Sequence, residues 1–189
     1  LDANTTADSN VAVGYAALGA NTTGTNNVGV GTGALDANTT ASSNTAIGSQ
    51  SLGANTTGAS NVAVGAFALD ANTTGNNNNA VGKSSLSSNT TGSNNTAMGH
   101  AALAVLATSS NNTAFGYAAL NVTTGGDNTA IGSNALAANT SASFNVAVGL
   151  NALTANTTGH SNVAIGAYVL DAATTAASNT GVGYGSLSI

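Results

Sequence analysis

Residues 61–75 read Asn-Val-Ala-Val-Gly-Ala-Phe-Ala-Leu-Asp-Ala-Asn-Thr-Thr-Gly, and related copies recur along the chain every 17 residues, with one step of 16. The eleven copies each open on an asparagine: Asn10, Asn27, Asn44, Asn61, Asn78, Asn95, Asn112, Asn128, Asn145, Asn162 and Asn179. We call these the opening asparagines, and the stretch from one to the next a coil. A fixed short period with invariant positions indicates a repeat architecture.

Two further positions do not vary from coil to coil. Four residues after the opening asparagine comes the column glycine: Gly14, Gly31, Gly48, Gly65, Gly82, Gly99, Gly116, Gly132, Gly149, Gly166 and Gly183. Four residues later comes the column leucine: Leu18, Leu35, Leu52, Leu69, Leu86, Leu103, Leu120, Leu136, Leu153, Leu170 and Leu187, with Leu1 in the same register. Because the period runs from end to end without a linker, we expect residues 1–189 to form a single repeat domain, and a piece of a longer repeat array.

The composition excludes several classes of function. Lys83 is the only base among 189 residues, six aspartates are the only acids, and cysteine is absent. A chain with one base and a negative net charge lacks the electrostatic attraction that nucleic acids and anionic membranes require. No apolar run approaches the ~20 residues that span a bilayer, so we expect no membrane insertion. Without cysteine there is neither a disulfide nor a thiolate metal site.

Each coil reads as short extended segments separated by a turn. After the opening asparagine, large, small and large side chains alternate, as in Val62-Ala63-Val64, which is typical of a strand. A second short run leads from the column glycine to the column leucine, and Asn-Thr-Thr-Gly then forms a turn. No Asn-Gly or Asp-Gly dipeptide marks a tight hairpin. We therefore predict an all-β fold, a parallel β-solenoid (β-roll) of eleven 17-residue coils with two short strands per coil.

In such a stack every invariant residue lies over its copy, about 4.8 Å away. We expect two buried apolar ribs, one of column leucines and one of the Val/Ile residues that precede the column glycines. The opening asparagines are predicted to form a structural ladder of side-chain amides, each donating to one copy and accepting from the other. Alternatively, exposed asparagines would only favour the local turn. Both faces of the strands carry apolar residues, which favours self-association, side by side or end to end.

Two adjacent coils depart from the pattern. The coil from Asn95 carries Ala104-Val105-Leu106-Ala107 in place of the usual turn, and the coil from Asn112 is one residue short. A kink, a contact patch or simple drift in a surface turn would each account for this difference.

We find no pattern that indicates an enzyme. His100 and His160 occupy different positions in coils several repeats apart, and glutamate is absent. A paired-carboxylate or Ser-His-acid site would have to be assembled from scattered aspartates. The incomplete Gly125-Gly126-Asp127 stretch does not establish a calcium site. We predict no catalytic residue, metal or cofactor.

The Asn-Thr-Thr turn has two possible uses besides turning the chain. Its asparagines match the N-glycosylation sequon at Asn4, Asn21, Asn38, Asn55, Asn72, Asn89, Asn139 and Asn156, as do Asn94, Asn111 and Asn121 elsewhere. Glycans attached at ~4.8 Å intervals would crowd one another. Regular threonines could instead order water, as in ice-binding proteins, or bind a glycan.

The unit Asn-x-Ala-Val/Ile-Gly-x-x-Ala/Ser-Leu, clearest in residues 44–48 and 61–65, resembles the head repeats of trimeric autotransporter (YadA-like) adhesins. It also resembles repeats of bacterial and phage tail-fibre-like surface proteins. This resemblance covers all eleven coils, but the period is longer and no neck, stalk or anchor accompanies it. The resemblance implies a β-roll, three chains packed along one axis, and binding to host surface or matrix.

We therefore expect an extracellular or cell-surface structural protein that assembles with copies of itself into a fibre or filament, or forms an adhesin head. The alternative is an ice- or glycan-binding module that uses the Asn-Thr-Thr face. A specific ligand would meet the variable positions after the column glycine, which include the aromatic residues Tyr15, Phe67, Tyr117, Tyr168 and Tyr184.

Overall fold

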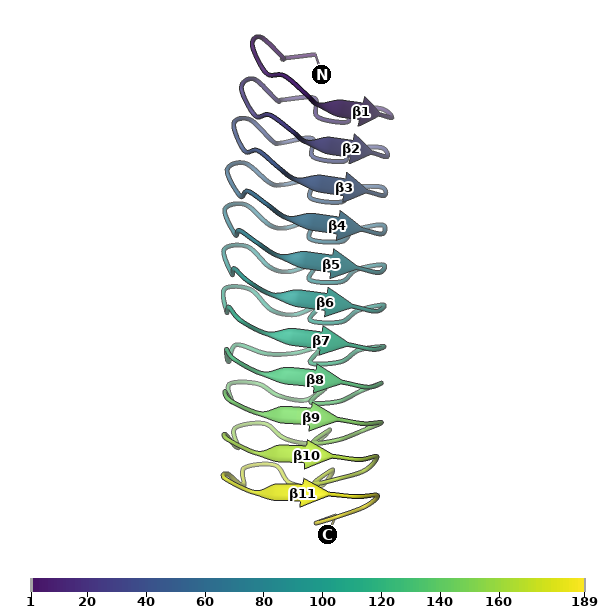
Figure 1. The fold of residues 1–189 in the computed structure, drawn as a ribbon, viewed down its shortest axis with the longest axis vertical. Coiled ribbons are helices and arrows are strands. Elements are labelled where there is room, and N and C mark those ends of the chain that lie inside the picture. The colour runs from purple at the N-terminus through teal and green to yellow at the C-terminus, as the bar shows by residue number, and fades with distance from the viewer. Residues whose placement is uncertain (1, 189) are drawn as a thin grey trace.

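The computed structural model describes residues 2–188, so Leu1 of the predicted leucine column lies outside the described residues. Its regular elements are eleven three-residue strands: β1 (Val11–Val13), β2 (Val28–Val30), β3 (Thr45–Ile47), β4 (Val62–Val64), β5 (Asn79–Val81), β6 (Thr96–Met98), β7 (Thr113–Phe115), β8 (Thr129–Ile131), β9 (Val146–Val148), β10 (Val163–Ile165) and β11 (Thr180–Val182). They form one sheet in chain order, and all neighbouring pairs are parallel, as Val62 opposite Asn79 illustrates. Figure 1 shows the coils stacked into a rod. The predicted parallel β-solenoid is confirmed.

The prediction of two strands per coil is wrong, because each complete coil contributes one strand to the sheet. The second apolar run folds into a turn in which two residues adopt left-handed backbone angles, φ 58° at Phe67 and 51° at Leu69 in the coil from Asn61. Left-handed φ breaks the alternation of side chains that defines a strand. The turn still bonds to the next coil, since the Leu69 amide donates to the Ser85 carbonyl at 3.0 Å. An isolated bridge between Val105 and Val122 is the one further β-pairing found in the described chain.

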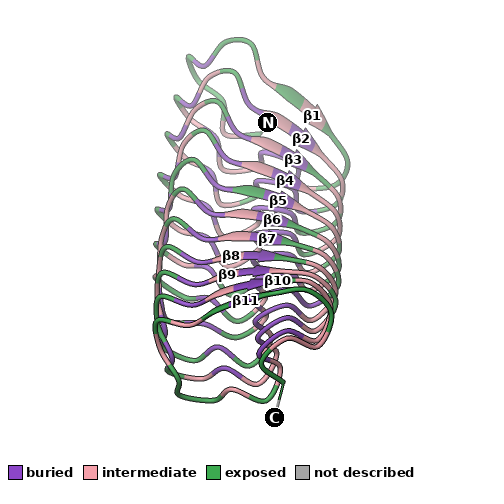
Figure 2. Ribbon diagram, turned by 60° about the horizontal axis from the view of Figure 1, so that its bottom comes forward, coloured by how far each residue is buried: buried purple, intermediate pink, exposed green. Residues whose placement is uncertain are grey.

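The column leucines form the predicted buried rib. From Leu18 to Leu153 they are fully buried, Leu170 is nearly so, and Leu187 in the last coil is exposed. The residue before each leucine from Leu18 to Leu170, which is alanine or serine except for Val169, and the central residue of most strands, such as Ala46 in β3, complete the core. Figure 2 shows these buried strand centres in purple.

The second predicted rib is wrong, because the Val/Ile side chains point away from the core. Ile47 and Ile165 are each more than 40% exposed, whereas Ala46 between the two outer residues of β3 is buried. Space explains this orientation: an alanine Cβ at Gly29, the centre of β2, would lie 3.4 Å from Leu18 Cγ. The gap between strand and leucine rib therefore takes an alanine and leaves no room for a branched side chain.

The short coil is accommodated without a register shift. Thr113 of β7 pairs with Thr129 of β8, although 16 residues separate them instead of 17. The deletion is therefore absorbed in the turn, and the sheet runs through it unchanged. In the neighbouring coil Leu106 is buried while Val105 is about half exposed.

Candidate functional site

The opening asparagines link each coil to itself and to the next one. In the coil from Asn61, Asn61 Nδ2 donates to the Gly75 carbonyl at 2.9 Å, and Asn61 Oδ1 accepts from the backbone N–H of Asn78 at 2.9 Å. These side chains are buried from Asn27 to Asn162, and Asn10 and Asn179 at the two ends are partly exposed. The buried side chain thus forms hydrogen bonds with a turn carbonyl of its own coil and with the backbone N–H of the opening asparagine in the next coil.

This arrangement differs from the predicted ladder, in which side-chain amides bond to one another. The strong contacts run from side chain to backbone. Direct amide-to-amide contacts in this column are longer and occur at some steps, for example 3.2 Å from Asn61 Nδ2 to Asn44 Oδ1.

A true amide ladder is formed instead by the turn asparagines, the first residues of the Asn-Thr-Thr turns. Asn72 Nδ2 donates to Asn55 Oδ1 of the preceding coil at 2.9 Å and to the Gly75 carbonyl at 3.1 Å. The Gly75 carbonyl therefore accepts from both Asn61 and Asn72, so the two asparagines of a coil converge on one inward-pointing oxygen. Sequence reasoning missed this pairing, although the 11-residue spacing of the two asparagines repeats from coil to coil.

Burial of the turn asparagines argues against the predicted glycosylation. The fully buried members are Asn21, Asn38, Asn55, Asn72, Asn89, Asn139 and Asn156. Asn4 in the first coil is exposed, but its side-chain amide bonds to the backbone of Ala7. A glycan would be attached to Nδ2, the atom that faces the coil interior and donates the ladder hydrogen bonds. The folded coil leaves no space for it.

The ladder is interrupted where the sequence changes. Leu106 and Ala173 stand where turn asparagines are expected, and the Oδ1 atoms of the preceding members, Asn89 and Asn156, are buried without a hydrogen-bond partner. Thr123 substitutes for an asparagine more successfully, because its hydroxyl accepts from Asn139 Nδ2 at 3.0 Å. Each unpaired amide oxygen weakens the folded state.

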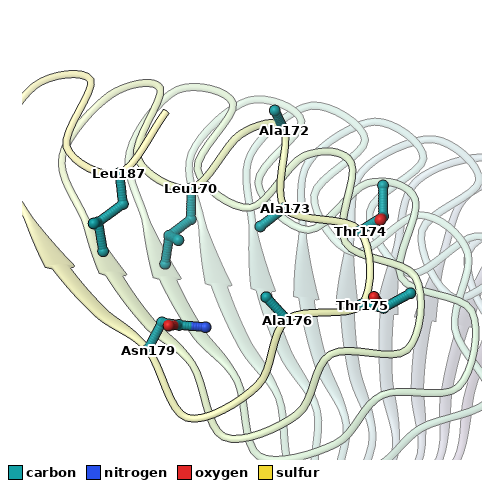
Figure 3. A pocket seen from close by; sticks show the side chains of 8 residues that line it. All are labelled: Leu170, Ala172, Ala173, Thr174, Thr175, Ala176, Asn179 and Leu187. Atoms are coloured by element: carbon teal, nitrogen blue, oxygen red, sulfur yellow. The ribbon is translucent and has the colours of Figure 1, made fainter. Parts of the chain in front are cut away.

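Replacing Ala173 with asparagine is expected to stabilise the protein by about 1 kcal/mol. The new amide would donate to Asn156 Oδ1, as Asn72 does to Asn55. Room exists, because Ala173 lines a pocket of about 360 Å³ inside the last coils together with Leu170, Ala176 and Leu187 (Figure 3). The measurement is the midpoint of urea unfolding.

Ala172→Asn is the matched control, because Ala172 also borders the pocket but is exposed, and its side chain points outward in Figure 3. It should leave the midpoint unchanged. Equal effects of the two substitutions, or destabilisation by Ala173→Asn, would contradict the role assigned to the ladder.

The two threonines of each turn have different surroundings. The first is half-buried in most turns, and its hydroxyl bonds to the next coil, as in the 3.0 Å contact from Thr56 Oγ1 to the Thr73 carbonyl. The second, for example Thr57, is exposed. The Asn-Thr-Thr face therefore presents one free row of threonine side chains instead of a two-dimensional array.

An exposed surface rich in apolar side chains lies on the sheet. We call it the strand face: the outward side chains of the first and third residues of β1–β11. Its third-residue column includes Val13, Ile47, Met98, Phe115, Ile131, Ile165 and Val182, all at least 38% exposed. The strand face carries no charged residue. The sequence shows which residues alternate, but it does not show which set faces outward.

Ionisable groups are sparse and scattered. No three histidines or acids lie close enough to hold a metal ion within residues 2–188. His100 and His160 are exposed and lie in separate coils. Burial raises the pKa of the Asp70 carboxyl, and backbone hydrogen bonds at Asp70 and Ala71 oppose that shift. The described residues also form no helix that could cross a membrane.

Comparisons with protein-family models, with curated proteins and with solved structures found no match for this chain.

Proposed function

We propose that this chain is a structural rod that associates side by side with copies of itself and builds a surface fibre or an adhesin head outside the cell. The observation that carries the proposal is the strand face, on a protein whose core is already complete. Its third-residue column is apolar in all eleven strands, and its first-residue column holds valine in five strands and uncharged polar residues, threonine or Asn79, in the other six. Eleven strands at ~4.8 Å spacing and ~3.3 Å per residue make this face ~50 Å long and ~10 Å wide.

The size of the face supports an interface. Its total area of ~500 Å², which includes the threonines and Asn79 of the first-residue column, is comparable with the largest apolar patches of monomeric proteins, which are often functional. Flanking side chains would bring each partner towards the ~800 Å² of a typical stable interface. The absence of charge on the face removes the desolvation cost that buried charges would add. The resemblance of the repeat unit to adhesin heads and tail fibres points to the same use.

The proposal is tested by placing like charges on the face. The double variant Ile47→Glu and Ile131→Glu should be monomeric in sedimentation velocity, whereas the unmodified protein forms oligomers or filaments visible by electron microscopy. Both isoleucines point outward and are 41% exposed, so the coil itself should stay folded, as circular dichroism would report.

The matched control is Thr57→Glu with Thr158→Glu, which adds the same charge on the exposed threonine row. It should assemble like the unmodified chain. A monomeric unmodified protein, or identical behaviour of the two double variants, would refute lateral assembly through the strand face.

Ice or glycan binding through the Asn-Thr-Thr face is supported less well. The turn asparagines point inward, and the first threonine hydroxyl is engaged with the next coil. One row of exposed threonines remains, and ice-crystal shaping by dispersed protein is the measurement that would favour this use.

A further inference from the structure

The residues that follow the column glycines form an edge column beside the strand face. In three consecutive coils, which begin at Asn78, Asn95 and Asn112, this column holds Lys83, His100 and Tyr117. All three side chains are exposed, and they follow β5, β6 and β7, which are paired in register. The stacking therefore places each about 4.8 Å from the next at the backbone. We call these three residues the edge patch.

Two members of the edge patch form a pair of stacked rings. The rings of His100 and Tyr117 are stacked, with centroids 5.6 Å apart and planes inclined by 11°. Met98 and Phe115 of the adjacent strand face are also partly exposed and extend the apolar surface. Exposed aromatic surface of this kind is enriched where proteins bind partners, because rigid rings lose little entropy on binding.

The edge patch also contains the only base of the chain. The net charge is −5, but no acidic residue occurs between positions 71 and 126. The coils of Lys83 and His100 therefore contain no carboxylate, and Asp127 at the end of the Tyr117 coil is the one acid of the three coils. An otherwise acidic molecule thus has one local site where an anionic group is attracted, next to a stacked pair of aromatic rings.

We propose that the edge patch binds an acidic sugar unit of a glycan. The C–H face of the sugar ring would lie against the exposed, stacked ring pair of His100 and Tyr117, and its carboxylate would meet the Lys83 ammonium. A carboxylate and an ammonium form a charge-assisted hydrogen bond, which is stronger than a neutral one. A long polyanion such as nucleic acid fits poorly, because one base cannot offset repulsion from six aspartates. This inference goes beyond lateral assembly and does not require it.

The test is ligand-observed saturation-transfer NMR with a galacturonate trisaccharide, its uncharged galactose counterpart and inorganic phosphate. The acidic sugar should receive magnetisation at its ring protons, and neither the neutral sugar nor phosphate should compete with it at equal concentration. Lys83→Gln should weaken binding about fivefold, the size expected for one exposed charged contact. Tyr117→Ala should weaken it at least as much. Other coils carry Ser133 or Ala167 at this position, so both variants should fold.

Tyr15→Ala is the matched control, because Tyr15 occupies the same column, is 83% exposed and has no base in the adjacent coil. It should bind the acidic sugar as the unmodified chain does. The proposal is overturned if the acidic sugar does not bind, if the neutral sugar binds equally, if phosphate displaces it, or if Lys83→Gln has no effect.

Discussion

Alanine in place of Gly65 is expected to destabilise the solenoid by about 3–5 kcal/mol, which is exceptional for the addition of one methyl group. Two causes combine. The backbone of Gly65 has φ +134°, a conformation that is essentially confined to glycine. An added Cβ would also lie 2.6 Å from the Gly82 carbonyl oxygen, which belongs to the next coil and cannot move without disturbing the stack.

The loss would be measured by urea unfolding of the whole chain. Because stability in a solenoid depends on contacts between neighbouring coils, we expect the transition to broaden or split as the array is divided at this coil. The same contact recurs along the column, since an alanine Cβ at Gly149 would lie 2.3 Å from the Gly166 carbonyl oxygen.

Gly29→Ala makes the same chemical change at the centre of a strand and is the control. This position holds alanine in nine of the other coils, and a Cβ there would meet no atom closer than 3.2 Å. We expect a change within about 1 kcal/mol, towards higher stability. Similar losses for the two variants would show that the column glycines are not special.

Aspartate in place of Asn78 is expected to make stability strongly dependent on pH. Asn78 is fully buried, its Nδ2 donates to the Gly92 carbonyl at 2.8 Å, and its Oδ1 accepts from the Asn95 amide at 3.0 Å. A protonated aspartate can make both hydrogen bonds, but an ionised one places an oxygen anion against the Gly92 carbonyl oxygen. Burial and this repulsion would raise the folded-state pKa well above the ordinary value of about 3.9.

The direction of the pH effect follows from that raised pKa. The variant should approach the unmodified protein in stability below about pH 4, and lose stability as the pH rises through the folded-state pKa. At pH 7 we expect a deficit of about 3 kcal/mol or more, measured by urea unfolding at a series of pH values.

Asn77→Asp is the control one residue away. Asn77 is exposed, and Asp127 occupies the equivalent position in another coil with the same left-handed backbone. Its stability should follow that of the unmodified chain across the pH range. A deficit of Asn78→Asp that does not change with pH would contradict the hydrogen-bond assignment.

Much of the architecture could be predicted because the period is itself structural information. Residues 17 apart, such as Val62 and Asn79, pair because coils of equal length superimpose when stacked, and the one 16-residue coil is corrected in its turn. The buried leucine rib followed from the same reasoning. The candidate sites were harder to predict from the sequence. The column glycines recur because of their backbone conformation, the turn asparagines because of their hydrogen bonds, and the strand face because its side chains point outward. Periodicity alone does not distinguish these causes.

The sequence by itself determined that like residues stack over like, that the chain is an all-β parallel solenoid, and that Leu69 and its copies are buried. Only the tertiary structure decided which face of each strand points inward. Ala63 faces the core and Val64 faces solvent because the space beside the leucine rib is one methyl group deep, a distance that no local pattern contains. The structure also decided that Leu69 sits in a left-handed turn and not in a second strand, because contacts with the next coil stabilise a backbone that leucine disfavours alone.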